Sequence, residues 1–275
     1  MDAKLYLCAT PIGNLEDITL RVSRVLAEVD CIYCEDTRRT AKLLNALDLS
    51  KPLISCHTHN EQQRAQQIAQ KLREGVAVAY VSDAGMPGIS DPGEKLIAEC
   101  IRENLPFEVL PGASAALTAL VLSGLPSQDA CFAGFLPRTG KARRERIARL
   151  GAHHGTLILY ESPLRVAGTL SELLQSWGDR PACLVRELTK VYEQAVRGTL
   201  ASLAERYVDA PPKGECVLLI GGRTEQTLQQ DPETLLSALL EQGVSAKDAA
   251  KQVSALTDIP RNQAYAMALE LGRKE

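Results

Sequence analysis

The feature that most constrains this chain is a regular alternation of short apolar runs with segments of helical periodicity across its first half. The apolar runs lie at residues 4–10, 31–35, 53–58, 76–83 and 107–112, and the helical segments lie between them at 20–29, 37–47, 60–74 and 93–104. Alternation of this kind predicts βαβ units around a mostly parallel sheet. Ligands of such sheets bind beyond the carboxyl ends of the strands, so the loops that follow strands are the informative ones.

The pattern changes after residue 124. Strand-like runs follow at 131–137, 156–162, 182–188, 193–200 and 215–221, and residues 191–197 look like a hairpin partner, which predicts a mixed sheet. A polar linker at 223–230 precedes three short helices: one at 234–242 ended by Gly243, one at 246–256 capped by Ser245, and one from near Pro260 capped by Asp258. We therefore expect two α/β domains, 1–124 and 125–223, and a helical unit at 231–275.

Composition narrows the class of protein. A net charge of −3 argues against a general polyanion binder. The eight cysteines are scattered along the chain, which favours a reduced, cytoplasmic protein over a disulfide scaffold. The longest uncharged stretch, 109–128, is interrupted by Pro111 and Gly124, so it predicts a short packed helix and no membrane span.

Three loops that follow strands are rich in glycine, proline or small residues, at 10–15, 82–93 and 110–116. The second holds three glycines and two prolines, which make a rigid wall of exposed backbone groups. Asp83 lies at a strand tip, where its carboxylate can accept hydrogen bonds from a ribose or an amine. Ser114 is placed to cap the helix after the third loop. These positions favour ligand binding.

Familiar cofactor and metal signatures are missing. No G-x-G-x-x-G follows the first strand, and the segment from Gly134 to Lys141 has five residues between its glycines where a phosphate-binding loop needs four. Cys31 and Cys34 have no second pair and would point to opposite faces of a strand. His57 and His59 lack a clear third ligand. We expect neither a nucleotide-binding motif of these types nor a metal site.

Residues 138–149 carry six basic side chains and one acidic side chain on an otherwise acidic protein. Such a local concentration is typical of a polyanion contact, and the preceding loop favours RNA. The candidate RNA-binding residues are Arg138, Lys141, Arg143, Arg144 and Arg146. Charged pairs also follow strands at 35–38, 161–165 and 187–190, although such pairs are more often structural than catalytic.

A set of motifs runs through residues 10–222 in a fixed order. They are TPIGN at 10–14, EDTR at 35–38, HNE at 59–61, SDAGMP at 82–87, DPG at 91–93, GFLP at 134–137, YESP at 160–163 and RELTK at 186–190. As a set they resemble the tetrapyrrole-methylase superfamily of S-adenosylmethionine-dependent methyltransferases, and within it the branch that methylates small-subunit ribosomal RNA. Met86 stands where threonine is usual, and Leu164 where histidine is common.

The resemblance implies two α/β domains with S-adenosylmethionine in the cleft between them, a homodimer, and methyl transfer to the ribose 2′-oxygen of a cytidine in the decoding centre of 16S rRNA. It also implies that residues 246–275 form a helix-turn-helix appendage. By matching positions, the cofactor would be lined by Pro11, Ile12, Asp83, Gly85, Met86, Ser114, Ala115 and Tyr160.

A ribose hydroxyl is a poor nucleophile, so a base or a nearby cation should assist the transfer. Our hypothesis is that Glu187 or Glu35 accepts the proton, with Lys190 or Arg38 holding the adjacent phosphate; the sequence does not choose among them. One rival is a methyltransferase of the same fold that acts on a tetrapyrrole or corrinoid precursor. The other is a DNA-binding regulator that uses residues 231–275, which their five basic and seven acidic side chains disfavour.

Overall fold

The computed structural model describes residues 1–223, 232–257 and 259–271, and its contacts divide the chain into two units. The first unit comprises Met1–Thr118 together with Glu187–Glu193. The second comprises Ala119–Arg186 and Gln194–Glu275. The segment Glu187–Glu193 therefore packs with the first unit although the chain on both sides of it belongs to the second.

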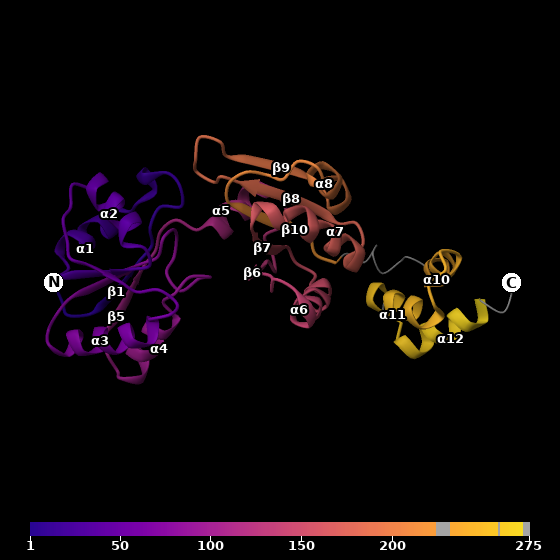
Figure 1. Ribbon diagram of the computed structural model, residues 1–275, viewed down its shortest axis with the longest axis horizontal. Helices are drawn as coiled ribbons and strands as arrows, with labels where there is room; N and C mark the ends of the chain where they lie inside the picture. The colour runs from indigo at the N-terminus through magenta and orange to yellow at the C-terminus, as the bar shows by residue number, and fades with distance from the viewer. Residues whose placement is uncertain (224–231, 258, 272–275) are drawn as a thin grey trace. The chain divides into compact units, whose positions relative to one another are not determined.

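The first unit is built on a parallel sheet in the order β3-β2-β4-β1-β5, which confirms the predicted fold class. Helices α1 and α2 cover one face of this sheet, and α3 and α4 cover the other (Figure 1). The strands are β1 (Leu5–Cys8), β2 (Cys31–Cys34), β3 (Leu53–Ser55), β4 (Val78–Val81) and β5 (Phe107–Leu110). The helices are η1 (Leu15–Asp17), α1 (Leu20–Glu28), α2 (Thr37–Ala46), α3 (Glu61–Arg73) and α4 (Glu94–Arg102).

Strand β2 shows why the sheet needs both helical layers. Cys31 and Tyr33 belong to the apolar cluster that includes α3 and α4, whereas Ile32 and Cys34 belong to the cluster that includes α1 and α2. Side chains alternate between faces along a strand, so a continuous apolar run is stable only when both faces are covered. The prediction that Cys31 and Cys34 point to opposite faces is confirmed.

The second unit contains a mixed sheet in the order β6-β7-β10-β8-β9. Strands β6 and β7 run parallel, whereas the pairs β7–β10, β10–β8 and β8–β9 are antiparallel, and β9 is the expected hairpin partner. Its strands are β6 (Cys131–Phe135), β7 (Leu157–Glu161), β8 (Pro181–Arg186), β9 (Gln194–Thr199) and β10 (Cys216–Ile220). Its helices are α6 (Gly140–Gly151), η2 (Pro163–Arg165), α7 (Val166–Trp177) and α8 (Leu200–Tyr207), and α5 (Ala115–Ser123) spans the boundary of the units.

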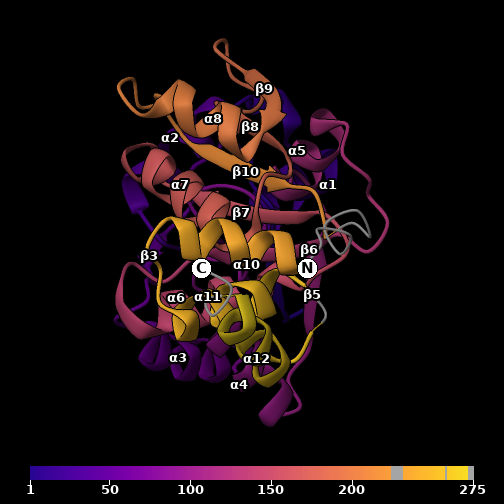
Figure 2. The same cartoon turned by 90° about the vertical axis from the view of Figure 1, so that its right-hand side faces the viewer.

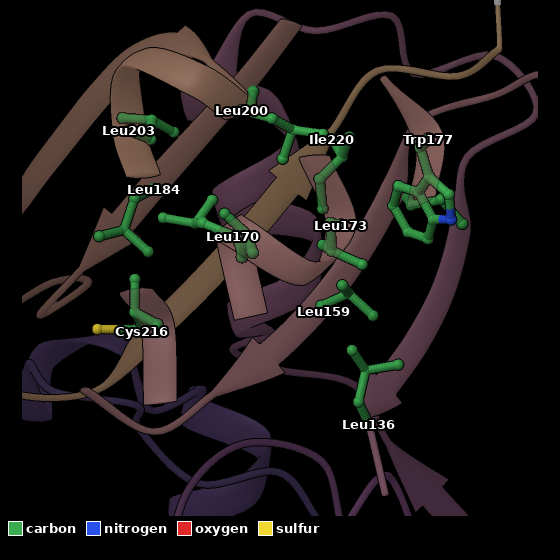
Figure 3. Close-up of a cluster of buried hydrophobic side chains, with 14 of the residues drawn as sticks. Leu136, Leu159, Leu170, Leu173, Trp177, Leu184, Leu200, Leu203, Cys216 and Ile220 are labelled. Atoms are coloured by element: carbon green, nitrogen blue, oxygen red, sulfur yellow. The ribbon is translucent and has the colours of Figure 1, made fainter. Parts of the chain in front are cut away.

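The core of the second unit lies between one face of this sheet and helices α6, α7 and α8. Figure 3 shows Leu170, Leu173 and Trp177 of α7 among the strand residues that share this core. The indole Nε1 of Trp177 donates a hydrogen bond to the Ile147 carbonyl at 3.0 Å, which fixes α7 against α6. Burial of the large apolar face of α7 is thus a main contribution to the stability of this unit.

We expect Leu173→Ala to lower the free energy of unfolding of the second unit by about 2–5 kcal/mol, because it opens a cavity beside a fully buried side chain. Trp177 is the sole tryptophan of the chain, so its fluorescence in a urea titration reports on this unit. Leu164, which is 86% exposed, supplies the control: Leu164→Ala should change stability by at most about 0.5 kcal/mol. Equal effects of the two substitutions would contradict this account of the core.

The C-terminal helices are α10 (Pro232–Glu241), α11 (Ala246–Leu256) and α12 (Arg261–Leu271), which Figure 2 shows as the yellow end of the chain. They pack around a small apolar cluster. Helix α11 has the predicted bounds, and the Ser245 hydroxyl accepts a hydrogen bond from the Asp248 amide at 3.2 Å, which confirms the predicted cap. Residues 224–230 of the linker predicted at 223–230, and the predicted cap at Asp258, lie outside the described residues. In the described part of the chain, no helix combines the length and the hydropathy needed to cross a membrane.

Candidate functional site

Three loops of the first unit meet at Gly85. The Thr10 amide donates to the Gly85 carbonyl at 2.9 Å and the Gly85 amide donates to the Thr10 carbonyl at 3.0 Å, so the loop after β1 is tied to the loop after β4. A β-carbon on Gly85 would lie 3.4 Å from Ile12 and 3.7 Å from the Ala113 carbonyl, so the loop after β5 reaches the same point. Strands β4, β1 and β5 are neighbours in the sheet, which is why their following loops converge.

This convergence brings together most of the residues expected to line the cofactor. Pro11 and Ile12 lie beside Gly85 and Met86, and Ser114 and Ala115 directly follow Ala113. Gly85 has φ +78°, a left-handed conformation that favours glycine. The Ser114 carbonyl accepts from the Thr118 amide at 3.0 Å as α5 begins.

Tyr160, the remaining expected cofactor residue, lies on β7 of the second unit. Its ring makes edge-on contacts with Phe132, at a centroid distance of 5.0 Å, and with Phe135, at 5.6 Å. The register of β6 against β7 shifts between Phe132 and Gly134, which allows both phenylalanines to reach the same tyrosine. The three rings form an aromatic group in which both phenylalanines are exposed.

Asp83 links the loop after β4 to the loop after β2. Its Oδ1 accepts from the Asp36 amide at 3.1 Å, and its Oδ2 lies 3.4 Å from Arg39 Nη1. Burial, and secondarily the charge of Asp83, raise the pKa of Glu35. Among the described residues, Glu35 Oε2 is buried and has no hydrogen-bond partner. The structure therefore assembles an acidic cluster, defined here as Glu35, Asp83 and Asp91.

Asp91 gives this cluster a measurable pH dependence. Burial raises its pKa from 3.8 to about 6, with a further contribution from the charge of Glu35. The folded protein thus favours the protonated carboxyl, and this stabilisation is complete below pH 3.8 and is lost as the pH rises through 6. Asparagine keeps a neutral side chain at every pH and avoids that loss.

We therefore expect Asp91→Asn to raise the melting temperature by a few degrees at pH 8 and to leave it close to wild type at pH 4. Thermal unfolding followed by circular dichroism at both pH values measures this. Asp17→Asn, an exposed substitution outside the acidic cluster, is the matched control and should show no such difference between the two pH values. A shift for Asp91→Asn that is the same at pH 4 and pH 8 would rule out ionisation as its cause.

Arg38 is paired within its own loop. Asp36 caps α2 by accepting from the Arg38 amide at 2.8 Å, and its carboxylate also accepts from the Arg38 guanidinium at 3.1 and 2.7 Å. These hydrogen bonds hold the pKa of Asp36 well below its usual range. The Arg38 side chain remains 86% exposed, so the guanidinium that was expected to hold a phosphate lies at the surface.

The segment Glu187–Glu193 packs against the loop after β1. The Asn14 amide donates to Thr189 Oγ1 at 2.9 Å, and a β-carbon on Gly13 would lie 2.6 Å from the Leu188 carbonyl. Glu187 and Thr189 have φ values of +53° and +62°, which are strained for side chains of this kind. Lys190 Nζ donates to Glu187 Oε1 at 2.9 Å. The candidate pair Glu187 and Lys190 is thereby fixed beside the loop after β1.

The basic segment lies on and before helix α6. Arg138, Lys141 and Arg144 are exposed, whereas Arg146 is half-buried and donates to the Ala133 carbonyl at 3.4 Å. The prediction that Arg143 belongs to the exposed basic surface is wrong, because Arg143 is only 8% exposed.

The Arg143 guanidinium donates to Glu172 Oε2 at 2.6 Å, Thr169 Oγ1 at 2.9 Å and the Pro137 carbonyl at 3.1 Å. Its spacing in the sequence does not distinguish it from its exposed neighbours, since only the packing of α6 on α7 turns it inward. We do not include Arg143 in the surface proposed for RNA contact.

Sequence reasoning missed three residues of this site. Arg39 contacts Asp83, Asp91 belongs to the acidic cluster, and Thr189 joins two distant loops. Arg39 directly follows the EDTR motif and Asp91 lies in the glycine-rich loop, so both had a local signal. Thr189 stands in the RELTK motif, but the motif does not reveal its role, which depends on a contact between residues 175 positions apart. In the described residues, no group of histidine, cysteine, aspartate and glutamate side chains is arranged to hold a metal ion.

Two family models match the chain. Residues 4–204 match the family described as Tetrapyrrole (Corrin/Porphyrin) Methylases, and residues 226–272 match the RsmI C-terminal HTH domain. The first match covers the whole first sheet and strands β6 to β9 of the second, and β10 lies beyond its end. The second match spans the described helices α10 to α12.

Named relatives and a solved structure agree with these matches. A protein of Halalkalibacterium halodurans named ribosomal RNA small subunit methyltransferase I is 42% identical over 268 residues, which cover 95% of this chain and 93% of the relative. A protein of the same name from Synechocystis is 41% identical over 272 residues, or 97% of this chain and 98% of the relative. A solved structure, that of uroporphyrin-III C-methyltransferase from Thermus thermophilus crystallised with S-adenosylhomocysteine, shares the fold. The TM-score is 0.54 and the sequence identity is 22%, over 79% of this chain and 97% of that chain.

Proposed function

Because the chain belongs to the tetrapyrrole (corrin/porphyrin) methylase family, we propose that it is an S-adenosylmethionine-dependent methyltransferase that modifies the ribose 2′-oxygen of a cytidine in the decoding centre of 16S ribosomal RNA. The observation that carries the choice of an RNA substrate is the identity of about 40% over nearly the whole chain to proteins named ribosomal RNA small subunit methyltransferase I. The choice of nucleotide and of atom is what the resemblance of the motif set implies.

The loops that meet at Gly85 suit the proposed cofactor. Glycine at this point leaves backbone groups open to close approach, and the loops are fixed by the paired hydrogen bonds between Thr10 and Gly85. The Asp83 carboxylate offers acceptor oxygens for a ribose hydroxyl or an ammonium group. In this proposal the cofactor is held by Pro11, Ile12, Asp83, Gly85, Met86, Ser114 and Ala115, with Tyr160 of the second unit as a further expected contact.

The bound cofactor supplies a methyl group that is already activated on a sulfonium sulfur. The protein then has to align the attacking oxygen and to accept its proton, which rigid loops accomplish better than mobile side chains. We assign the proton to Glu187, because its side chain is 19% exposed and is fixed beside the loop after β1. Glu35 Oε2 is buried, which favours a structural role for it in the acidic cluster. Lys190, at 2.9 Å from Glu187, is placed to hold the adjacent phosphate.

We also propose that the protein acts as a homodimer. Strand β5 is an edge strand of the first sheet, and its Phe107 and Val109 are 37% and 46% exposed. On α5, Leu117 and Val121 lie one helical turn apart and are 63% and 82% exposed. Apolar side chains exposed on an edge strand, or in a row along a helix, are each typical of an association surface. Light scattering of the purified protein measures its mass in solution.

The function is tested by incubating the protein with methyl-labelled S-adenosylmethionine and, separately, free 16S rRNA, 30S subunits and a corrinoid precursor. We expect label in RNA, and mass mapping of nucleosides should find one additional 2′-O-methylcytidine. Calorimetry with S-adenosylhomocysteine tests cofactor binding independently. Label on the corrinoid precursor alone would favour the rival small-molecule activity, and label on a base or another ribose would overturn the proposed position.

A further inference from the structure

The second unit contains a cavity of about 510 Å³ whose lining is dominated by arginine. One side is formed by the connection from β6 into α6, with Arg138, Arg143 and Arg144. The other side is formed by η2 and the start of α7, with Arg165 and Glu172. We propose that this arginine pocket binds a backbone phosphate of the RNA strand that carries the target nucleotide. The inference rests on the proposed function and adds a binding site to it.

The floor of the arginine pocket is a network of polar groups in which Arg143, Thr169 and Glu161 are buried and Glu172 is partly exposed. Arg143 donates to Glu172 and to Thr169 Oγ1, and the Thr169 hydroxyl in turn donates to Glu161 Oε2 at 2.8 Å. Glu161 is 3% exposed. Because these groups satisfy one another, Arg143 contributes little free charge, and its function is to hold the two sides of the pocket together.

The remaining arginines are available to a ligand in different degrees. Arg165 Nε lies 3.1 Å from Glu161 Oε1 and Arg165 Nη2 donates to the Leu136 carbonyl at 3.2 Å, so its guanidinium is held in place while 30% of the side chain stays exposed. Arg138 and Arg144 are exposed and lie at the opening; within the described residues neither takes part in a hydrogen bond or an ion pair. One fixed and two adaptable guanidinium groups thus face the same space.

This arrangement selects for phosphate. Guanidinium groups bind phosphate oxygens in pairs, and the cavity volume lies within the range of sites that hold a nucleotide-sized group. Glu172 and Glu161 balance Arg143 and Arg165, so Arg138 and Arg144 give the pocket a net positive charge. That charge would repel the positively charged sulfonium cofactor, so the arginine pocket is not a second cofactor site. Leu164, 86% exposed at the rim, offers apolar contact to a ribose or base next to the bound phosphate.

Helix α6 provides a matched pair of variants for the test. Arg144 lines the pocket and Arg149 does not, yet both are exposed arginines of the same helix. We expect Arg144→Ala to weaken binding of a short fluorescein-labelled single-stranded RNA about 10-fold, as for the loss of one charge-assisted hydrogen bond. The slope of its log affinity against log salt concentration should become shallower by about 0.7, which corresponds to the loss of one phosphate contact. Arg149→Ala should retain the wild-type slope, and Arg138→Ala should behave like Arg144→Ala.

Fluorescence anisotropy of the full chain at several salt concentrations gives both the RNA affinity and its salt slope. In a second measurement at constant ionic strength, inorganic phosphate should displace the labelled RNA less effectively from the Arg144→Ala variant than from the wild-type protein. Equal losses of RNA affinity for Arg144→Ala and Arg149→Ala would overturn the proposal for the arginine pocket, and so would an unchanged salt slope in both variants. The proposed function would still stand in either case if the wild-type protein methylates rRNA. Selective loss for Arg144→Ala without any methyl transfer by wild type would overturn the proposed function alone.

Discussion

Glu187→Gln should lower kcat for methyl transfer about 10²–10⁴-fold, the range over which general-base catalysis contributes. The amide cannot accept the proton of the ribose hydroxyl, but it preserves the size of the side chain and the position of its loop. Binding of S-adenosylhomocysteine, measured by calorimetry, should stay close to wild type, because the contacts of the loops at Gly85 do not involve this carboxylate. The expected signature is therefore a loss in kcat without a loss in cofactor affinity.

Two further substitutions make this result decisive. Glu16→Gln removes an exposed carboxylate from η1, near the same loop, and should leave kcat unchanged. Glu35→Gln tests the alternative base. If Glu35→Gln abolishes transfer while Glu187→Gln retains it, the proton acceptor is Glu35. If both variants transfer methyl groups at near the wild-type rate, neither carboxylate acts as the base.

Gly13→Ala should lower kcat/KM by roughly 10²-fold, because a displacement of about 1 Å at a reacting centre is enough for such a loss. A β-carbon at this position would lie 2.6 Å from both the Leu188 carbonyl and Thr189 Oγ1, and 2.7 Å from Lys190 Cγ. The backbone of Leu188 cannot move without moving its neighbour Glu187. The substitution therefore displaces the proposed base, although it adds only one methyl group at a residue that carries no chemistry.

Gly75→Ala separates this steric effect from a general loss of stability. Gly75 has φ +84° and no atom within 4 Å of its would-be β-carbon, so alanine there strains the backbone without touching the site. We expect Gly75→Ala to lower the melting temperature slightly and to keep kcat/KM. Steady-state kinetics with 30S subunits and thermal unfolding of both variants provide the comparison. Wild-type kinetics for a folded Gly13→Ala protein would show that the contact of this loop with Glu187–Glu193 does not position the base.

Much of the fold could be predicted because its signals are local. The alternation of apolar runs and helical segments in the first half is confirmed as a parallel sheet with two helical layers, and Ser245 caps α11 as its side chain and position predict. The sequence also places loops 10–15, 82–93 and 110–116 directly after strands, where ligands of parallel sheets bind. Their meeting depends on the strand order, which puts β4, β1 and β5 side by side and which the sequence pattern does not give.

The sequence by itself determined the two α/β sheets, the position of three loops directly after strands, and the basic character of residues 138–149. Only the tertiary structure decided that Glu187–Glu193 leaves its own sheet to pack on Gly13, that Arg143 turns inward to Glu172, and that Glu35 shares an acidic cluster with Asp91. The reason is physical. Strand and helix formation depend on neighbours in the chain, whereas the burial and pairing of a charge depend on residues that folding brings together from far apart.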